Sequence, residues 1–293
     1  MSATLGELNF PEPNDASAHA IGLVEGEDDA PKDIAEYEER VVAFIDILGF
    51  SDLVRASEHD VSGEQLRLLS QALDISPQLA DALKSPTQSD APLANARIHT
   101  FSDFVVVSHE KSAVGFAVVL FLSWLIAKDW LSKGFLPRGG IAVGKLVHRT
   151  HNGHTSGAPM VFGPAFLHAY GVESGIADVA RIALHVSARK YRTEILSETT
   201  LKGVRLGSVK SLAFKCPDGP WAIDIFSHLR KNGFQLKNDG QRTEAEQFAQ
   251  QLQVRLERDA DNPQHYKKAH WLAQQFNNAI VETQYADLRL TFD

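Results

Sequence analysis

The chain has 293 residues, a formal net charge of −8 and a hydrophobic share of 44%. This is enough for one large domain with a buried core, or one domain with an appendage. The acidic balance argues against a protein whose main partner is nucleic acid, because phosphate backbones require clustered Lys and Arg. Cys216 is the only cysteine, which excludes an intrachain disulfide and makes a cytoplasmic location the expectation.

The first 38 residues carry three prolines and an acidic cluster, without a sustained apolar period. This composition predicts an acidic flexible arm over residues 1–38. No basic stretch followed by an apolar run is found at its start, so a signal peptide is not expected.

Residues 41–47 (VVAFIDI) predict a buried strand, because they are apolar and partly β-branched apart from one carboxylate, Asp46. The strand ends at a tight turn containing Gly49 and Phe50. Gly49 lets backbone N–H groups approach a phosphate where a helix opens near Ser51. Leucine spacing predicts helices from there to about residue 84.

A hairpin is predicted by the apolar stretches 96–101 and 104–108, with Asp103 at or near its turn. A helix is expected over residues 112–133. Its apolar run, residues 113–127, is shorter than the roughly 20 residues that cross a bilayer, which favours a core helix and no membrane span. A strand at 138–146 leads into a polar loop with three histidines, His148, His151 and His154. Nothing there fixes the tetrahedral geometry of a zinc site.

The remaining elements are expected at 165–172 (helix), 181–186 (strand), 188–196 (helix) and 221–226 (strand). Two amphipathic helices follow beyond residue 231. The order β-α-β-β-α-β with later additions predicts a ferredoxin-like α/β (α+β) sandwich with one open sheet face. We therefore expect a catalytic domain at 39–228 and a helical C-terminal extension at 229–293.

Two carboxylates, Asp46 and Asp103, stand at the ends of apolar strands. A buried carboxylate is costly unless it is paired or metal-bound, although an Asp at a strand end also caps turns. Adjacent carboxylates suit Mg²⁺ or Mn²⁺. Two such ions activate a 3′-hydroxyl, polarise the α-phosphate of a nucleoside triphosphate and stabilise the leaving pyrophosphate.

Four segments resemble motifs of the class III nucleotidyl cyclases, and the resemblance covers residues 41–226. They are 46–50 (DILGF), 98–103 (IHTFSD), 138–144 (RGGIAVG) and 163–174 (GPAFLHAYGVES). The resemblance implies that Asp46, Asp103 and the backbone carbonyl of Ile47 hold two ions, Mn²⁺ or Mg²⁺. It further implies a homodimer with the active site between the subunits, and a separate cyclic-nucleotide-binding effector that senses the product.

The departures from the family concern the transition state and the base. Leu167 and Gly171 stand where the family has its transition-state Asn and Arg, and His99 and Met160 stand where purine cyclases read the base. The combination resembles the pyrimidine cyclases of bacterial antiphage signalling. UTP, giving cyclic UMP and pyrophosphate, is the expected substrate. CTP, giving cyclic CMP, and a catalytically inactive nucleotide-binding domain remain alternatives.

Strand alternation places Arg97 and His99 on the same face as Asp103, so both are candidate substrate-binding residues together with Gly49 and Phe50. The guanidinium of Arg97 suits a phosphate or a pyrimidine carbonyl, the alternative being a solvated charge at a strand end. Phe50 suits a sugar or base, the alternative being a core aromatic. A diguanylate-cyclase-like or polymerase-like palm is disfavoured because the sequence GGDEF is missing.

Overall fold

The computed structural model of the chain describes residues 36–74, 93, 95–149, 160–194, 200–201, 204–234 and 240–292. The predicted arm up to residue 35, the predicted helix around Leu79 and Leu83, and the loop histidines His151 and His154 lie outside these residues.

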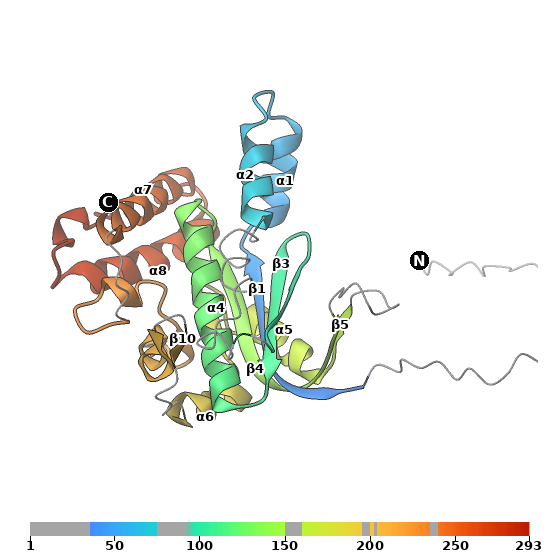
Figure 1. The fold of residues 1–293 in the computed structure, drawn as a ribbon. Helices are drawn as coiled ribbons and strands as arrows, with labels where there is room; N and C mark the ends of the chain where they lie inside the picture. Colours follow the sequence, from blue (N-terminus) through green and yellow to red (C-terminus); the bar gives the residue numbers. More distant parts are fainter. Residues whose placement is uncertain are drawn as a thin grey trace, which may run out of the picture. The chain divides into compact units, whose positions relative to one another are not determined.

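An eight-stranded sheet forms the centre of the domain (Figure 1). Its strand order is β2-β3-β1-β4-β6-β10-β9, and β5 pairs with β4 off this path. The strands are β1 (Glu38–Ile47), β2 (Arg97–Thr100), β3 (Phe104–Glu110), β4 (Pro137–Arg149), β5 (Met160–Phe162), β6 (Ile182–Leu184), β9 (Ala213–Lys215) and β10 (Trp221–Ile223). A separate two-stranded sheet pairs β7 (Thr200–Leu201) with β8 (Val204–Arg205).

The first four strands confirm the predicted ferredoxin-like arrangement. β1 lies between β3 and β4 and is antiparallel to both, while β2 pairs with β3 as a hairpin. β6 extends this unit by pairing in parallel with β4, and β10 and β9 follow. The mixed α/β fold expected from the order of the elements is therefore the observed one.

Helices cover both faces of the sheet. α4 packs against β1 and β3 on one face, and α5 packs against β4 and β1 on the other (Figure 1). The helices are α1 (Phe50–Glu58), α2 (Glu64–Leu73), α4 (Ala113–Ser132), α5 (Pro164–Gly175), α6 (Val186–Glu194), α7 (Gln241–Arg258) and α8 (Pro263–Ile280). The described residues also form the 3₁₀ helices η2 (Leu206–Leu212), η3 (Ser227–Leu229) and η4 (Ala286–Leu288).

Among the described residues, α4 is the helix that is long and apolar enough to cross a membrane by length and composition. Within its apolar window 78% is buried inside the domain, which is typical of a core helix. Ser112 caps the helix by accepting a hydrogen bond from the N–H of Gly115, and Trp124 donates its indole N–H to the carbonyl of Ile225. Gly134 ends the helix with a positive φ of 85°, as expected of a terminating glycine.

Alternation along β1 divides its side chains between two cores. Val41, Ala43, Ile45 and Ile47 belong to the large core that contains α4 and the C-terminal helices α7 and α8. The side chains between them in the sequence, such as Val42 and Phe44, point to the other face of the sheet and join a smaller cluster beneath α5. Since side chains alternate along a strand, Asp46 lies on the α5 face.

The backbones of α5 and β4 approach each other closely because glycines occupy β4. A Cβ added to Gly140 would stand 2.2 Å from the carbonyl oxygen of Ala169 on α5. A Cβ on the neighbouring Gly139 would stand 2.2 Å from the carbonyl oxygen of Phe44 on β1. Neither position accepts a side chain without backbone movement.

The last predicted strand, residues 221–226, is shorter in the structure and ends at Ile223. The carboxylate of Asp224 accepts a hydrogen bond from the N–H of Phe226 at 3.2 Å, which begins a turn instead of continuing the strand.

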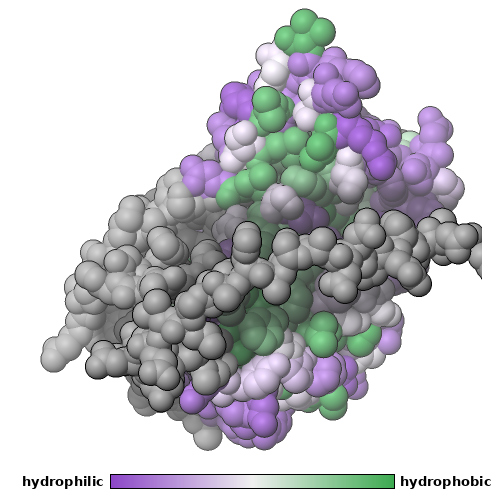
Figure 2. All heavy atoms as spheres, turned by 90° about the vertical axis from the view of Figure 1, so that its right-hand side faces the viewer, coloured by the Kyte–Doolittle hydropathy of each residue, from purple (hydrophilic) through white to green (hydrophobic). Residues whose placement is uncertain are grey.

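Figure 2 shows hydrophobic side chains on the upper part of the molecule, where α1 and α2 form a helical hairpin. Its exposed apolar side chains are Val54, Val61 and Leu66.

Candidate active site

Asp46 and Asp103 are neighbours at one end of the sheet. The register of β1 and β3 pairs Asp46 with Phe104, and the N–H of Ile47 donates to the carbonyl oxygen of Asp103 at 3.1 Å. The turn between β2 and β3 thus brings Asp103 beside the end of β1, as the predicted hairpin requires. Ile47, whose carbonyl is the third expected ligand, is the last residue of β1.

A guanidinium bridges two buried carboxylates at this end. Arg138, directly opposite Asp46 on β4, donates from Nη2 to Oδ2 of Asp46 at 3.0 Å and also forms an ion pair with Glu173 of α5. The side chains of Asp46 and Glu173 are 14% and 5% exposed. Arg138 thus serves two carboxylates, and the charge of Asp103 lies close enough to act on Asp46 as well.

Burial dominates the electrostatics of this cluster. Burial raises the pKa of Asp46 to about 6, against the opposing effect of Arg138 and with further increases from Glu173 and Asp103. Burial also raises the pKa of Glu173, while Arg138 lowers it. A further cation at the cluster would favour the ionised carboxylates and relieve their mutual repulsion.

The donor set fits a hard divalent cation that is completed by substrate. Among the described residues no three His, Cys, Asp or Glu side chains come together as a ready metal site. Mg²⁺ commonly takes one or two carboxylates and fills its remaining positions with water and phosphate oxygens. Asp46 and Asp103 match that pattern, and metal bound there would supply charge neutralisation for a phosphate.

Gly49 and Phe50 form the turn between the end of β1 and the start of α1. Gly49 has a φ of 77° and precedes α1, whose first residue is Phe50, and no side chain caps the helix start. This confirms the predicted turn that opens a helix. The N–H groups of Asp52 and Leu53 donate to the carbonyl of Gly49, which leaves those of Phe50 and Ser51 to face an anion. The ring of Phe50 packs partly buried against the large core, so its contact with a sugar or base stays a prediction.

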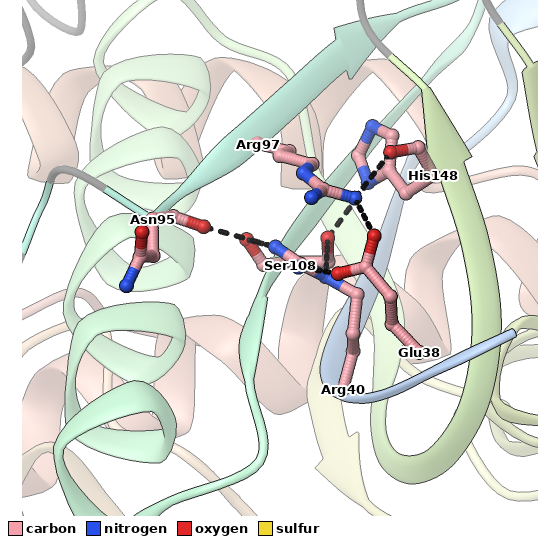
Figure 3. A network of polar contacts seen from close by, with 6 residues as sticks. All are labelled: Glu38, Arg40, Asn95, Arg97, Ser108 and His148. Atoms are coloured by element: carbon pink, nitrogen blue, oxygen red, sulfur yellow. Dashed lines mark hydrogen bonds and ion pairs between the residues drawn. The ribbon is translucent and has the colours of Figure 1, made fainter. Parts of the chain in front are cut away.

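A polar network occupies the opposite end of the same face (Figure 3). Arg97 donates to Glu38 at 2.6 Å and to the carbonyl of His148 at 2.7 Å. Arg97 pairs with Ser108, and hence lies alongside Val42, four residues before Asp46. At about 3.3 Å per residue, the backbone of Arg97 is offset from that of Asp46 by roughly 13 Å along the strands, and β3 lies between β2 and β1. Arg97 shares the predicted face but lies away from the carboxylates, and its role toward substrate stays a prediction.

An aromatic row connects the two ends. The ring of His99 stacks on Phe101 with centroids 4.4 Å apart, and Phe101 stacks on Phe104 at 4.4 Å. Phe104 in turn lies 4.9 Å from Phe44 and is the residue paired with Asp46. Burial lowers the pKa of His99, which favours its neutral form. Flat rings of this kind suit stacking with a nucleobase.

Ser108 connects Arg40 to His148. Its hydroxyl oxygen accepts from Nε of Arg40 at 2.9 Å and lies 2.7 Å from Nδ1 of His148. A hydroxyl has one donor and two acceptor lone pairs, so it either donates to Nδ1 or accepts from it, according to the tautomer of His148. Nε2 of His148 is buried and has no partner in the part of the chain that the structure describes.

Acid is expected to destabilise the protein through His148. Burial, followed by the charges of Arg40 and Arg97, lowers the pKa of His148 from 6.5 to about 3. The unfolded chain then binds a proton that the folded chain does not, so this contribution to stability is present above pH 6.5 and is lost as the pH falls toward 3. His148→Asn keeps an acceptor for Ser108 and does not titrate, so its melting temperature should fall less between pH 7 and about 4. Equal pH dependence in both proteins would contradict this assignment.

Solved structures of nucleotide cyclases are similar to this chain. The adenylyl cyclase CyaB from P. aeruginosa has 16% identity and a TM-score of 0.41, covering 64% of this chain and 94% of its own. A bacterial light-regulated adenylyl cyclase has 16% identity and a TM-score of 0.40. The match covers 55% of this chain and 46% of that protein. The guanylyl cyclase Cya2 has 12% identity and a TM-score of 0.38. The match covers 65% of this chain and 93% of that protein. No family model and no curated protein matches the chain. The similarity concerns the fold alone.

Two residues of the site were not predicted from the sequence as functional, Arg138 and Glu173. Both fall within the motifs quoted above, at 138–144 and 163–174, and that position was the available signal. At the family's Asn and Arg positions, Leu167 is 63% exposed and a Cβ on Gly171 would meet nothing within 4 Å. Both positions of α5 therefore face solvent in the single chain.

Proposed function

We propose that the chain is a nucleotide cyclase that converts UTP to 3′,5′-cyclic UMP and pyrophosphate with two Mn²⁺ or Mg²⁺ ions. The observation that carries this proposal is the juxtaposition of Asp46 and Asp103 beside an uncapped helix start at Gly49. Carboxylates there would hold the metal, and the N–H groups of the turn would receive phosphate oxygens. The chemistry then needs only an oriented 3′-hydroxyl and charge stabilisation.

The pyrimidine preference is supported by the residues of the expected base site. Burial lowers the pKa of His99, which favours the neutral ring, and the ring stacks on Phe101. Met160, the first residue of β5, offers only a thioether. A neutral imidazole and a thioether do not reproduce the donors and acceptors that read a purine edge. CTP is the second candidate, because the same contacts do not distinguish the two pyrimidines.

Incubation with equimolar ATP, GTP, CTP and UTP and with Mn²⁺, followed by mass analysis, tests the substrate. Cyclic UMP is expected as the main product. Cyclic CMP would select the alternative pyrimidine, and cyclic AMP or cyclic GMP would overturn the pyrimidine preference. Binding of a nucleotide without any cyclic product would indicate a non-catalytic nucleotide-binding domain.

A homodimer is part of the proposal. α5 presents Leu167 and Tyr170 with 63% and 48% of their surface exposed, and the adjoining β5 presents Phe162 at 44%. A second copy placed on this face would cover these side chains and enclose the open site, as the class III resemblance implies. Cyclic product would then act as a second messenger for a separate effector in antiphage defence, with the enzyme itself in the cytoplasm.

Tyr170→Glu is expected to produce monomers with at least about tenfold less activity, because a charge in an apolar contact is not compensated. Val281→Glu, at another exposed apolar position (55%), is the matched control and should leave assembly unchanged. Sedimentation and activity at several protein concentrations measure both. A fully active monomer would contradict the dimeric site.

A further inference from the structure

A cavity of about 460 Å³ lies on the far side of the turn that follows Asp46. Its walls come from the α1–α2 hairpin, from the turn after α4 and from the C-terminal helices α7 and α8. Apolar groups such as Leu53, Leu69 and Phe135 form part of the lining, and Gly49 and Arg255 stand in it together. The cavity thus adjoins the helix start of the candidate active site.

Arg255 of α7 is held close to that helix start. Its side chain is 8% exposed, and Nε donates to Oδ2 of Asp259 at 2.7 Å. Nη2 lies 3.8 Å from the place that a Cβ on Gly49 would take. Within the described part of the chain, neither Nη1 nor Nη2 has an acceptor. Arg255 lines the cavity, so these two donor groups are available to an anion beside Gly49.

The charges around the cavity favour an anion. Asp259 accepts from Arg255 and from Nε of Arg258, at 2.7 and 3.1 Å, so one carboxylate serves two guanidinium groups and leaves positive charge in excess. The other acidic group of the lining, Asp52, is 60% exposed and pairs with Arg55. Lys133, also in the lining, is bound to Asp129. The uncapped start of α1 adds its own partial positive charge.

Lys268 of α8 adds a second cation near the cavity. It follows His265, which lines the cavity, by three residues, and residues with this spacing share one face of a helix. Burial lowers the pKa of Lys268, the charges of Arg138 and Arg255 lower it further, and those of Asp178 and Asp259 oppose the shift. Lys268 therefore lies within electrostatic reach of both Arg255 and Arg138.

We propose that Arg255 and Lys268, from the C-terminal helices, bind the terminal phosphates of the nucleoside triphosphate at the start of α1. The inference rests on the proposed function and extends it, because it gives the helical extension a part in the substrate site. Asp46 and Asp103 would hold the metal, while Arg255 supplies a planar pair of donors to the β- or γ-phosphate and later to the pyrophosphate.

The direct test uses inorganic tripolyphosphate as the probe, in EDTA and at fixed ionic strength, measured by calorimetry on the full chain. The wild type should bind tripolyphosphate more tightly than inorganic phosphate. Arg255→Gln and Lys268→Gln should each weaken that binding about tenfold, as expected for a lost charged hydrogen bond. Lys267→Gln changes the neighbouring exposed residue, which pairs with Asp178, and should shift binding less than about twofold.

Asp52→Asn should change the affinity for tripolyphosphate in the opposite direction. It removes an exposed negative charge from the lining, so tripolyphosphate should bind a few-fold more tightly if the anion occupies this cavity. Arg255→Lys should recover part of the loss seen in Arg255→Gln, because it restores the charge without the planar fork. A folding defect would instead affect the melting curve of both Arg255 variants and would leave Lys268→Gln unaffected.

The outcomes separate this inference from the proposed function. Unchanged binding in Arg255→Gln and Lys268→Gln would overturn the phosphate assignment, whatever nucleotide the enzyme cyclises. Binding that weakens as expected in a protein without cyclase activity would support the anion site and refute the proposed reaction. In an active enzyme, the two variants should raise KM for the triphosphate by about tenfold.

Discussion

Replacing Asp103 by Asn is expected to lower the rate of cyclic nucleotide formation by about a thousandfold or more, since it removes a ligand from ions that supply most of the charge stabilisation. Asp103 is half-buried, its side chain accepts from the hydroxyl of Ser102 at 3.0 Å, and it forms no ion pair with another described residue. Its replacement should therefore leave the melting temperature almost unchanged. This separation of activity from stability makes Asp103 a cleaner test of the metal site than Asp46.

Asp46→Asn should abolish turnover as well, with a larger change in stability because it also breaks the contact with Arg138. Asp261→Asn, at an exposed position, serves as the matched control and should retain full activity. The measurements are product formation at saturating Mn²⁺ and thermal melting. Turnover near the wild-type rate in Asp103→Asn, at any Mn²⁺ concentration, would refute the assignment.

Arg138→Met is expected to destabilise the protein by about 3 to 5 kcal/mol at neutral pH, the cost typical of breaking a buried ion pair by removing one partner. The variant leaves the carboxylates of Asp46 and Glu173 buried without their shared cation. Urea unfolding at constant pH measures the loss. Adding Glu173→Gln to the variant should recover part of it, because one uncompensated charge is then removed.

The pH dependence of this loss has a defined sign. Without Arg138, both carboxyl groups have folded-state pKa values above their unfolded ones, because burial already raises them and the lowering contact is gone. The folded state then binds more protons than the unfolded state, so stability falls as the pH rises through this range. The deficit of Arg138→Met should be larger at pH 8 than at pH 5.5. A deficit independent of pH would mean that Arg138 acts through packing alone.

The strands and their carboxylates could be predicted because the signals are local. Alternating apolar residues interrupted by Ser102 and Asp103 specify a hairpin, and Gly49 marks the turn after β1. The contact between Arg138 and Glu173 could not be predicted in this way. It depends on how α5 docks across β4, which neither strand period nor helix period contains.

The same limit applies to Arg97 and Arg255. Alternation gave the face of Arg97 but not its ion pair with Glu38, which is contributed by the beginning of β1. Arg255 reaches Gly49 only because α7 packs against the large core, more than two hundred positions along the chain from the turn it approaches. Contacts of that sequence separation are set by tertiary packing, which a single sequence does not display.

The glycines of β4 determine how exactly the carboxylate cluster is positioned. At Gly140 the backbone of α5 rests on the backbone of the strand, so no rotatable side chain stands between the two. The spacing of Arg138 and Glu173 is consequently fixed by main-chain contact, with none of the adjustment that repacking of a side-chain layer would permit. The site therefore accommodates little change in the distance between α5 and β4. Even one added methyl group between helix and sheet would displace Glu173 relative to Arg138 and Asp46.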